Sequence, residues 1–592
     1  TPISKNSIYN ELGQDVVDYN RRLTEFGPRI FSQEVNTSRM VFGLDGSLPE
    51  DLPVVKDWKW EASYNYGRSD GTNANTGNLI LSHFANSIGP SFVDPALGPQ
   101  CGTPGNAIPN CIPLDLLHPG HVDPRAIAYM TFTGTQSGVS EQHTSLLTAS
   151  GKLVDLPNHG DISLAVGGDY RFERGSSIPD PLTSTGDTTG NASQPTIGSY
   201  NTFEGFSELS IVPYSGGEIL KWAELNGAGR AYRYNTFGSG VTGKVSGLVR
   251  TVGGVAMRGT YGTAFRAPSV AELFAGQGDN FPSIEDPCDT KPPSKKNQMM
   301  LDPMTEAQCK AQGVPTGSIF GTSQQRALSG GNTHLKAEHG NVTTAGVVYE
   351  PLRGFDVTAD YWRIQIDDAI TTLQPSTILA QCYQGGVQSF CDQIQRDPTS
   401  HVISHLINTV QNVGGLATSG VDFSAAYEYK NDAGSFRHSV EGTYLLKYNV
   451  DTGTLKDPKD PSKGNQIIHG RGYYDLGVNP DLKFNIFTLW SHPSGAGGGF
   501  NVRFIDSFQE CNQNNCNVVA NGRRDVSKYT TGDVYLAYGL KTAQGTTRIT
   551  AGMNNVANAT PALIYNGGGL NSDASAYDFM GRQFYLRLSQ QF

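Results

Sequence analysis

Carboxylate pairs and histidines are the residues of this chain whose types could carry out acid–base or metal chemistry. Two acidic pairs stand out, Glu285–Asp286 and Asp367–Asp368. Adjacent side chains on an extended segment point to opposite faces, so neither pair is suited to shared proton transfer. His334 and His339 flank Glu338 without any helical pattern that would bring them onto one face, so a solvated loop pair is the better interpretation. The sequence therefore predicts no catalytic residues and no metal ligands.

Two further stretches resemble ligand loops only superficially. The run Asp451–Lys463 alternates in charge and contains prolines, which favours a solvated loop over a calcium site. Gly330–Lys336 is glycine-rich but lacks the strand–loop–helix setting of a phosphate cradle, so we interpret it as a turn. No cofactor is expected, and the sequence does not identify ligand-binding residues.

The eight cysteines form four local couples, each in a segment rich in Gly, Pro or Asn. Metal sites favour closer CxxC pairs with histidine partners, which these couples lack. We therefore predict four loop-closing disulfides formed in an oxidising compartment. The predicted pairs are Cys101 with Cys111, Cys288 with Cys309, Cys382 with Cys391 and Cys511 with Cys516.

The composition favours β-structure that is rich in turns and aromatic residues. Among 592 residues there are 70 Gly, 26 Tyr and 26 Phe, and charged residues make up 17%. The net charge of −11 argues against a nucleic-acid partner, because nucleic acids require a basic surface. No apolar run approaches the roughly 20 residues of a membrane-spanning helix, so any membrane crossing is expected to use strands.

Alternation of apolar and polar residues is the dominant pattern from Glu34 onward. In the final stretch, Arg582–Phe592, apolar residues occupy alternate positions and polar ones lie between them. A side-chain period of two places these sets on opposite faces, so one face could contact lipid and the other water. On this pattern the residues expected to face the lumen of a barrel are Arg258, Arg266, Asp422 and Arg587.

We count about 17 such segments, joined alternately by short turns and long loops, which is typical of a transmembrane barrel. The fold class is therefore predicted to be all-β, a large antiparallel transmembrane β-barrel over 34–592, with residues 1–33 as an extracellular loop or irregular lead-in. A soluble β-sandwich is the alternative, but it rarely has so many long two-faced strands joined by such unequal loops. The long loops, four of them containing a cysteine couple, are predicted near 69–130, 267–333, 366–411, 447–470 and 505–528.

The stretches Gly259–Phe274, Asn412–Tyr429 and Gly552–Asn566 follow one another in an order that resembles the TonB-dependent outer-membrane receptor family. Gly259–Phe274 (GTYGTAFRAPSVAELF) is similar to the family's strand that leads into a long extracellular loop. Asn412–Tyr429 is similar to a strand that enters the barrel from a loop, and Gly552–Asn566 is similar to the last loop before the terminal strand. The resemblance extends from about Arg21 to Phe592 and implies that Tyr585 and Phe592 form the terminal barrel-assembly signal.

The resemblance also implies a plug domain and further barrel strands that we do not recognise in this sequence. Family members begin with a small globular plug domain, and residues 1–33 do not resemble one. The family barrel has about 22 strands, about five more than we count here. Open strand edges cannot persist in lipid, so we expect this chain to be the C-terminal part of a receptor, completed by an upstream segment or a second polypeptide.

By resemblance, the protein is expected to be an active transporter or receptor for a scarce nutrient in the outer membrane of a Gram-negative bacterium, and not an enzyme. Its expected partners are the lipid bilayer, the plug domain and the TonB complex, and a surface lipoprotein or another subunit over the loops is an additional candidate. The alternative function is a passive porin-like or structural outer-membrane barrel, alone or as one part of a split or multi-subunit assembly. The sequence leaves the substrate open.

Overall fold

The computed structural model describes most of the chain. The exceptions are residues 1, 18, 20, 50–55, 158, 293–299, 322–323, 452–466, 475–476, 511–523 and 566–570. The predicted couple Cys511 and Cys516 therefore lies outside the described residues, as does most of the run Asp451–Lys463.

The described chain is dominated by one 18-stranded sheet, of which the three-residue β22 (Ile467–His469) is a minor member. The other seventeen strands range from 9 residues in β29 to 26 in β6. They are β1 (Ile30–Ser47), β2 (Lys56–Leu79), β6 (Thr131–Leu156), β7 (Gly160–Pro179), β8 (Thr196–Ser215), β9 (Leu220–Tyr234), β10 (Gly238–Thr251), β11 (Val255–Arg266), β14 (Glu338–Leu352), β15 (Phe355–Asp367), β20 (Gly415–Asn431), β21 (Gly434–Asp451), β23 (Leu482–Ser491), β24 (Ala496–Ile505), β27 (Tyr529–Thr542), β28 (Gly545–Asn554) and β29 (Gln583–Gln591).

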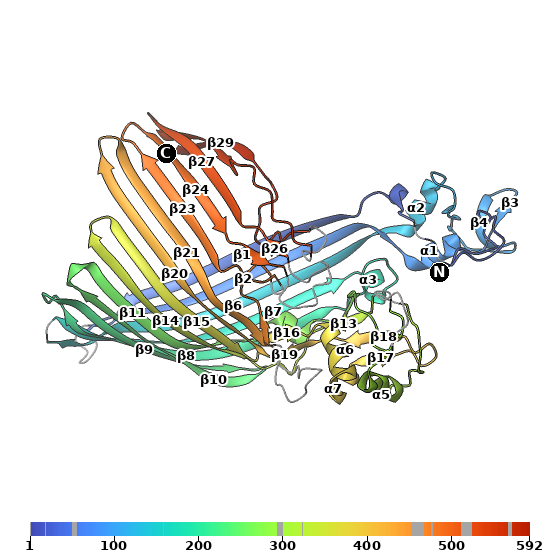
Figure 1. The fold of residues 1–592 in the computed structure, drawn as a ribbon, viewed down its shortest axis with the longest axis horizontal. Helices are drawn as coiled ribbons and strands as arrows, with labels where there is room; N and C mark the ends of the chain where they lie inside the picture. The colour runs from blue at the N-terminus through green and yellow to red at the C-terminus, as the bar shows by residue number, and fades with distance from the viewer. Residues whose placement is uncertain are drawn as a thin grey trace.

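Each long strand pairs antiparallel with the next one in this series, so the sheet is a simple meander. Within the described residues, β1 pairs only with β2 and β29 pairs only with β28, which makes them the two edges. Figure 1 shows that the strand direction rotates gradually across the sheet, from blue β1 to red β29. The predicted all-β antiparallel fold and its count of about 17 strands are confirmed.

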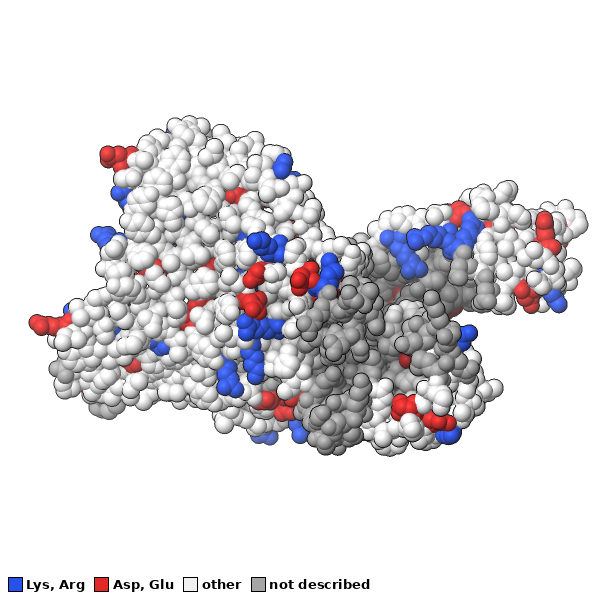
Figure 2. All heavy atoms as spheres, in the orientation of Figure 1, with Lys and Arg blue, Asp and Glu red and all other residues white. Residues whose placement is uncertain are grey.

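The two faces of the sheet differ in chemistry because side chains alternate along every strand. We call one side the apolar face; it includes Val166, Leu209 and Leu225. The register connects these residues across the strands, because Val166 is opposite Ser207 and Ser207 is opposite Gly229. The other side, here the polar face, includes Asp169 opposite Glu204. On the side of the molecule visible in Figure 2, charged side chains collect at the margin formed by the short turns and in a central zone, and the area between them is mainly white.

The N-terminal residues and the first long loop fold together into a small unit, which we call the knob. It comprises residues 1–26 and 80–130 and lies at the far end of β1, β2 and β6 (Figure 1). Its core includes Ile3, Ile88, Leu114 and Met130, all buried. Its elements are η1 (Thr24–Phe26), α1 (Leu81–Ile88), β3 (Ser91–Asp94), β4 (Gly98–Thr103), β5 (Asn106–Ala107) and α2 (Pro124–Met130).

Two other loops, 267–337 and 368–414, combine into a second unit, here called the loop module. Its short strands form the sheets β12-β13-β18-β17 and β16-β19. Residues of α5 and α6 pack in one buried core with residues of these strands, including Ala327 and Leu406. Its elements are α4 (Val270–Phe274), β12 (Gly278–Asn280), α5 (Pro303–Ala311), β13 (Ala327–Ser329), β16 (Ile370–Thr372), α6 (Pro375–Tyr383), α7 (Gln388–Cys391), β17 (Ile394–Arg396), β18 (Ile403–Ile407) and β19 (Val410–Asn412).

The remaining elements are short: α3 (Pro181–Thr185), η2 (Val252–Gly254), β25 (Phe508–Gln509) and β26 (Asp525–Val526). No helix among the described residues is both long enough and apolar enough to cross a membrane.

Several predicted loop boundaries differ from the structure. The segment 69–79, predicted as loop, continues β2, because it keeps its backbone pairing with β1 and β6. Its sequence is polar on both faces, so the alternation that marks a strand is lost while the hydrogen-bonded ladder persists. Strand β1 begins at Ile30 instead of 34, and β21 continues to Asp451, which shortens the predicted loop 447–470. The intervals 267–337, 368–414 and 506–528 lie close to the other predicted loops.

Candidate functional site

The four residues predicted to face a lumen lie on one side of the sheet. In the cross-strand register Arg258 is opposite Gly346, Gly346 is opposite Asp360, and Asp360 is opposite Asp422. The same alternation, followed across β21, β23, β24, β27 and β28, places Arg587 on this polar face as well. That this face lines the lumen of a closed barrel stays a prediction.

Neighbouring strands supply partners for two of these residues. Arg258 donates two hydrogen bonds to Asp360, from Nε to Oδ1 at 2.8 Å and from Nη2 to Oδ2 at 2.7 Å. Asp422 accepts from the Thr443 hydroxyl at 2.7 Å. Arg587 forms no side-chain hydrogen bond or ion pair within the described part of the chain, and it remains available to a further partner.

Arg266 ties the loop module to the sheet. It ends β11 and donates to both oxygens of Glu338 on β14, at 2.9 and 2.7 Å, and to both oxygens of Glu272 on α4, at 2.8 and 2.9 Å. Ser269 caps α4 through a reciprocal capping box with Glu272. Burial alone would raise the pKa of Glu272, but hydrogen bonds from Arg266 and Ser269 bring it below its ordinary value. One guanidinium therefore fixes the direction in which the chain leaves the sheet.

We expect Arg266→Ala to loosen α4 without unfolding the sheet, because it removes the only cation that bridges Glu272 and Glu338 in the described structure. The expected loss is about 1–3 kcal/mol of local stability, since charge-assisted hydrogen bonds disappear from a half-exposed site. Hydrogen exchange over residues 268–275 measures it. Arg587→Ala is the matched control and should leave exchange there unchanged; equal exchange in both variants would contradict the anchoring role.

A dense polar network occupies the polar face of β7, β8 and β9. Buried Glu204 accepts from Arg230 Nη1 at 2.5 Å and from the Tyr234 hydroxyl at 3.0 Å. Arg171 Nη2 donates to the same hydroxyl at 2.8 Å. Tyr200 and Tyr232 pack beside Tyr234, with Phe237 and Phe265 over them. Because Glu204 and the three tyrosines are buried, this network joins the three strands to one another. Only the guanidinium groups of Arg171 and Arg230 are partly exposed and can contact an anionic ligand.

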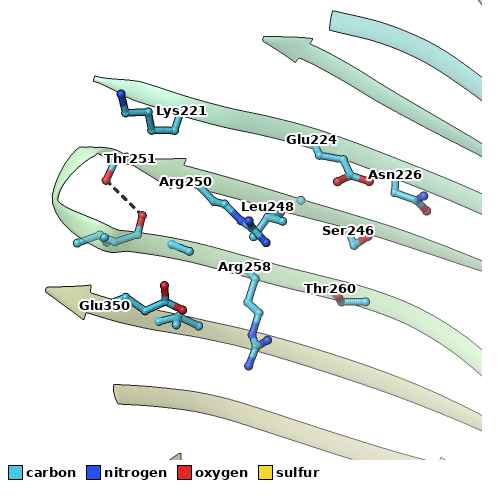
Figure 3. A pocket seen from close by; sticks show the side chains of 15 residues that line it. Lys221, Glu224, Asn226, Ser246, Leu248, Arg250, Thr251, Arg258, Thr260 and Glu350 are labelled. Atoms are coloured by element: carbon cyan, nitrogen blue, oxygen red, sulfur yellow. Dashed lines mark hydrogen bonds between the residues drawn. The ribbon is translucent and has the colours of Figure 1, made fainter. Parts of the chain in front are cut away.

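A recess of about 570 Å³ lies near the short-turn end of the sheet. Figure 3 shows its lining side chains projecting from four neighbouring strands, β9, β10, β11 and β14. Three cations, Lys221, Arg250 and Arg258, and two anions, Glu224 and Glu350, line it. The turn beneath it is closed by the Thr251 hydroxyl, which donates to the Val255 carbonyl at 3.3 Å. The mixed charge suits water or a polar protein segment better than an apolar ligand.

Disulfides and one buried ion pair hold the loop regions. The described residues contain three disulfides, Cys101–Cys111 in the knob and Cys288–Cys309 and Cys382–Cys391 in the loop module. Between the latter two, Arg396 donates to both oxygens of Asp286, at 2.6 and 2.7 Å, with side-chain exposures of 7% and 1%. Tyr383 donates to Gln312 and accepts from Arg396 at 2.7 Å. The module therefore has an interior of its own.

The role of Asp286 was not predictable from the sequence. The adjacent carboxylates Glu285–Asp286 do not act as a pair, because Asp286 is committed to Arg396, 110 residues away. No local signal marks such a distant partner. Among the described residues no group of three or more His, Cys, Asp and Glu side chains is placed to hold a metal ion.

Ionisation of Tyr383 should open the loop module at high pH. Burial raises the pKa of Tyr383 from its ordinary value of 10 to about 12. The folded module favours the neutral phenol, so burial of Tyr383 contributes to the stability of the module. This stabilisation is complete below pH 10 and is lost as pH rises from 10 to about 12. Ultraviolet absorbance of tyrosinate and proteolysis of the module should change together in that window. In Tyr383→Phe this step should be missing; an unchanged transition would assign it to another group.

Comparison with known proteins agrees with this architecture. The family model described as TonB dependent receptor-like, beta-barrel matches residues 4–556. The chain therefore belongs to the TonB-dependent receptor family, as its motifs predict, and it is a β-barrel component of the bacterial outer membrane. Members of this family are receptors and transporters. No curated protein matches the sequence.

Solved structures similar to this chain share little sequence with it. The RagAB peptide transporter has a TM-score of 0.50 at 11% identity, with 97% of this chain and 64% of that chain covered. The ferric enterobactin receptor PfeA of Pseudomonas aeruginosa has a TM-score of 0.49 at 13% identity, covering 95% and 71%. The siderophore receptor PirA of Acinetobacter baumannii has a TM-score of 0.48 at 10% identity, covering 95% and 80%.

Proposed function

We propose that this chain forms the wall and the ligand-facing loops of an active transporter for a scarce nutrient, powered through TonB. The observation that carries the proposal is the match to the receptor family over residues 4–556. Two features support it: the charged polar face of the wall, and the loop module at the end where ligand arrives. The four predicted wall residues Arg258, Arg266, Asp422 and Arg587 would contact water or the plug.

The direction of the edge strands supports completion by further strands. Seventeen long strands alternate in direction, so β1 and β29 run the same way. An antiparallel closure between two such edges requires an odd number of additional strands and gives an even total, as in bacterial single-chain barrels. We propose that these strands and a plug domain come from an upstream segment of the same receptor or from a second polypeptide.

Competitive growth tests the proposal. A strain lacking the gene should be outcompeted in at least one medium limited for a chelated metal, a vitamin, an oligosaccharide or a peptide, and re-expression should restore its fitness. Restoration should fail when TonB is also absent, because an active transporter needs energy coupling. If re-expression restores fitness equally without TonB, the protein is a passive pore and the proposal is wrong.

A further inference from the structure

Strands β14, β15, β20 and β21 form a panel whose apolar face changes in chemistry from one end to the other. At the short-turn end it presents aromatic residues, and the middle is uncharged on all four strands. The aromatic residues are Tyr349, Phe355, Tyr429 and Phe436. Towards the long-loop end come two more tyrosines, Tyr361 and Tyr444, and directly beyond them the cations Arg363 and Lys447. This order is that of a lipid-facing wall with an aromatic belt at each boundary.

The two cations lie in one row across the sheet. Arg363 is opposite Ser419, and Ser419 is opposite Lys447. Two strand spacings separate their backbones by about 10 Å, so the ends of these long side chains can reach one small anion. Arg363 and Lys447 are exposed, and Ser419 between them is buried, at 8% exposure. The pair therefore stands on the surface with a hydroxyl at its base.

Neither cation is neutralised by an ion pair in the described part of the structure. Arg363 makes one weak contact, from Nη2 to the Gln365 Oε1 at 3.3 Å, and Gln365 donates onward to Asp367 at 3.3 Å. Lys447 makes no side-chain hydrogen bond or ion pair with the described residues. The acidic residues Asp367 and Asp451 end the same strands, beyond the cations on the loop side. Positive charge is thus concentrated next to the aromatic boundary.

The same arrangement recurs elsewhere on the wall in a weaker form. Arg174 is exposed two positions beyond Phe172 on β7, and Arg233 is exposed near the loop end of β9, opposite Phe203. Beside Arg174, however, Glu141 is opposite it in the register and binds Arg68 at 2.9 Å. Of these sites on the described wall, the pair on β15 and β21 is therefore the one where two cations lie in one row without an acid between them.

We propose that Arg363 and Lys447 bind the phosphate-bearing headgroup of a lipid in the outer leaflet of the membrane. Long loops of such barrels face the cell exterior, so the row lies at the outer boundary of the bilayer. Basic side chains at that depth attract anionic headgroups, and the Ser419 hydroxyl and the neighbouring Asn449 and Gln365 amides supply neutral donors. The lipid chains would then lie along the uncharged middle of the panel.

The test uses the full-length protein in a non-ionic detergent, with diphosphorylated lipid A as the probe and native mass spectrometry as the readout. The variant Arg363→Gln/Lys447→Gln should bind the probe about thirtyfold more weakly than the unmodified protein, from roughly 1 kcal/mol per basic residue. Arg437→Gln/Arg548→Gln is the matched control: it removes the same charge from two exposed residues of the polar face and should bind normally. Equal losses in both double variants would overturn the proposal.

Two measurements on the unmodified protein do not depend on any variant folding. Lipid A without phosphates should bind much more weakly, and raising the salt concentration should weaken binding of the phosphorylated probe, since exposed charges are screened. Inorganic phosphate at millimolar concentration should not displace the probe. Binding that is indifferent to lipid phosphates or salt, or that free phosphate abolishes, would show that the row does not recognise a phosphate-bearing lipid headgroup.

Discussion

Asp286→Ala is expected to unfold the loop module while leaving the large sheet intact. The substitution leaves the Arg396 guanidinium, only 7% exposed, without its carboxylate partner inside the module. Removal of one member of a buried ion pair costs about 3–5 kcal/mol, because an uncompensated charge remains in a poorly solvated site. The two disulfides should keep the chain linked while the packing around Tyr383 and Leu406 is lost.

Limited proteolysis and hydrogen exchange over residues 282–337 and 368–413 measure this effect. Unchanged exchange over β14 and β15, together with resistance of the sheet to unfolding in detergent, shows that the barrel wall survives. Asp392→Ala is the matched control, since Asp392 is an exposed carboxylate of the same module with a single side-chain bond, from Gln388 at 2.9 Å. It should alter protection little. Protection of Asp286→Ala equal to that of the control would show that the ion pair does not hold the module.

An arginine on the apolar face should block stable insertion where an arginine one position away does not. Leu225 lies on the apolar face of β9 and is 57% exposed. Leu225→Arg should destabilise the inserted protein by about 2–4 kcal/mol, the cost of a cation near the middle of the bilayer. Urea unfolding in lipid vesicles, monitored by heat-dependent gel mobility, gives the difference in the free energy of unfolding between the variant and the unmodified protein.

Asn226→Arg is the control, because residue 226 points to the polar face, into the recess that also contains Glu224 (Figure 3). Its cost should be small. Equal destabilisation by both substitutions would mean that the two faces do not differ in environment, and the membrane-facing assignment of the apolar side would have to be abandoned.

The sheet could be predicted from the sequence because its evidence is local. Strict alternation, as in Ile162–Glu173, needs no knowledge of distant residues and reports directly that the two faces meet different surroundings. Where both faces are polar, as in 69–79, the local signal vanishes although pairing with β1 and β6 continues. Strand ends were therefore less predictable than strand centres.

The loop module and the knob were not predictable in the same way. Their interiors are built by contacts between segments far apart in sequence, such as Asp286 with Arg396, and by short helices without a long periodic pattern. Aromatic residues in the loops illustrate the limit: Tyr383 and Phe390 are core residues, whereas Phe281 and Tyr565 are 45% and 48% exposed. Composition alone does not distinguish packing from exposure, so the ligand-contacting residues stayed unidentified.

The extension of β2 from Ser69 to Leu79 gives the protein an unusual reach. At about 3.3 Å per residue it carries the knob roughly 35 Å beyond Arg68, which follows Tyr66 by two positions on the same face of β2. At its tip, the turn between β3 and β4 presents Leu97, 74% exposed. Because the long loops of such barrels face the cell exterior, we expect an antibody approaching an intact cell to meet this turn before the wall. A short affinity tag placed there should then mark the protein on living cells.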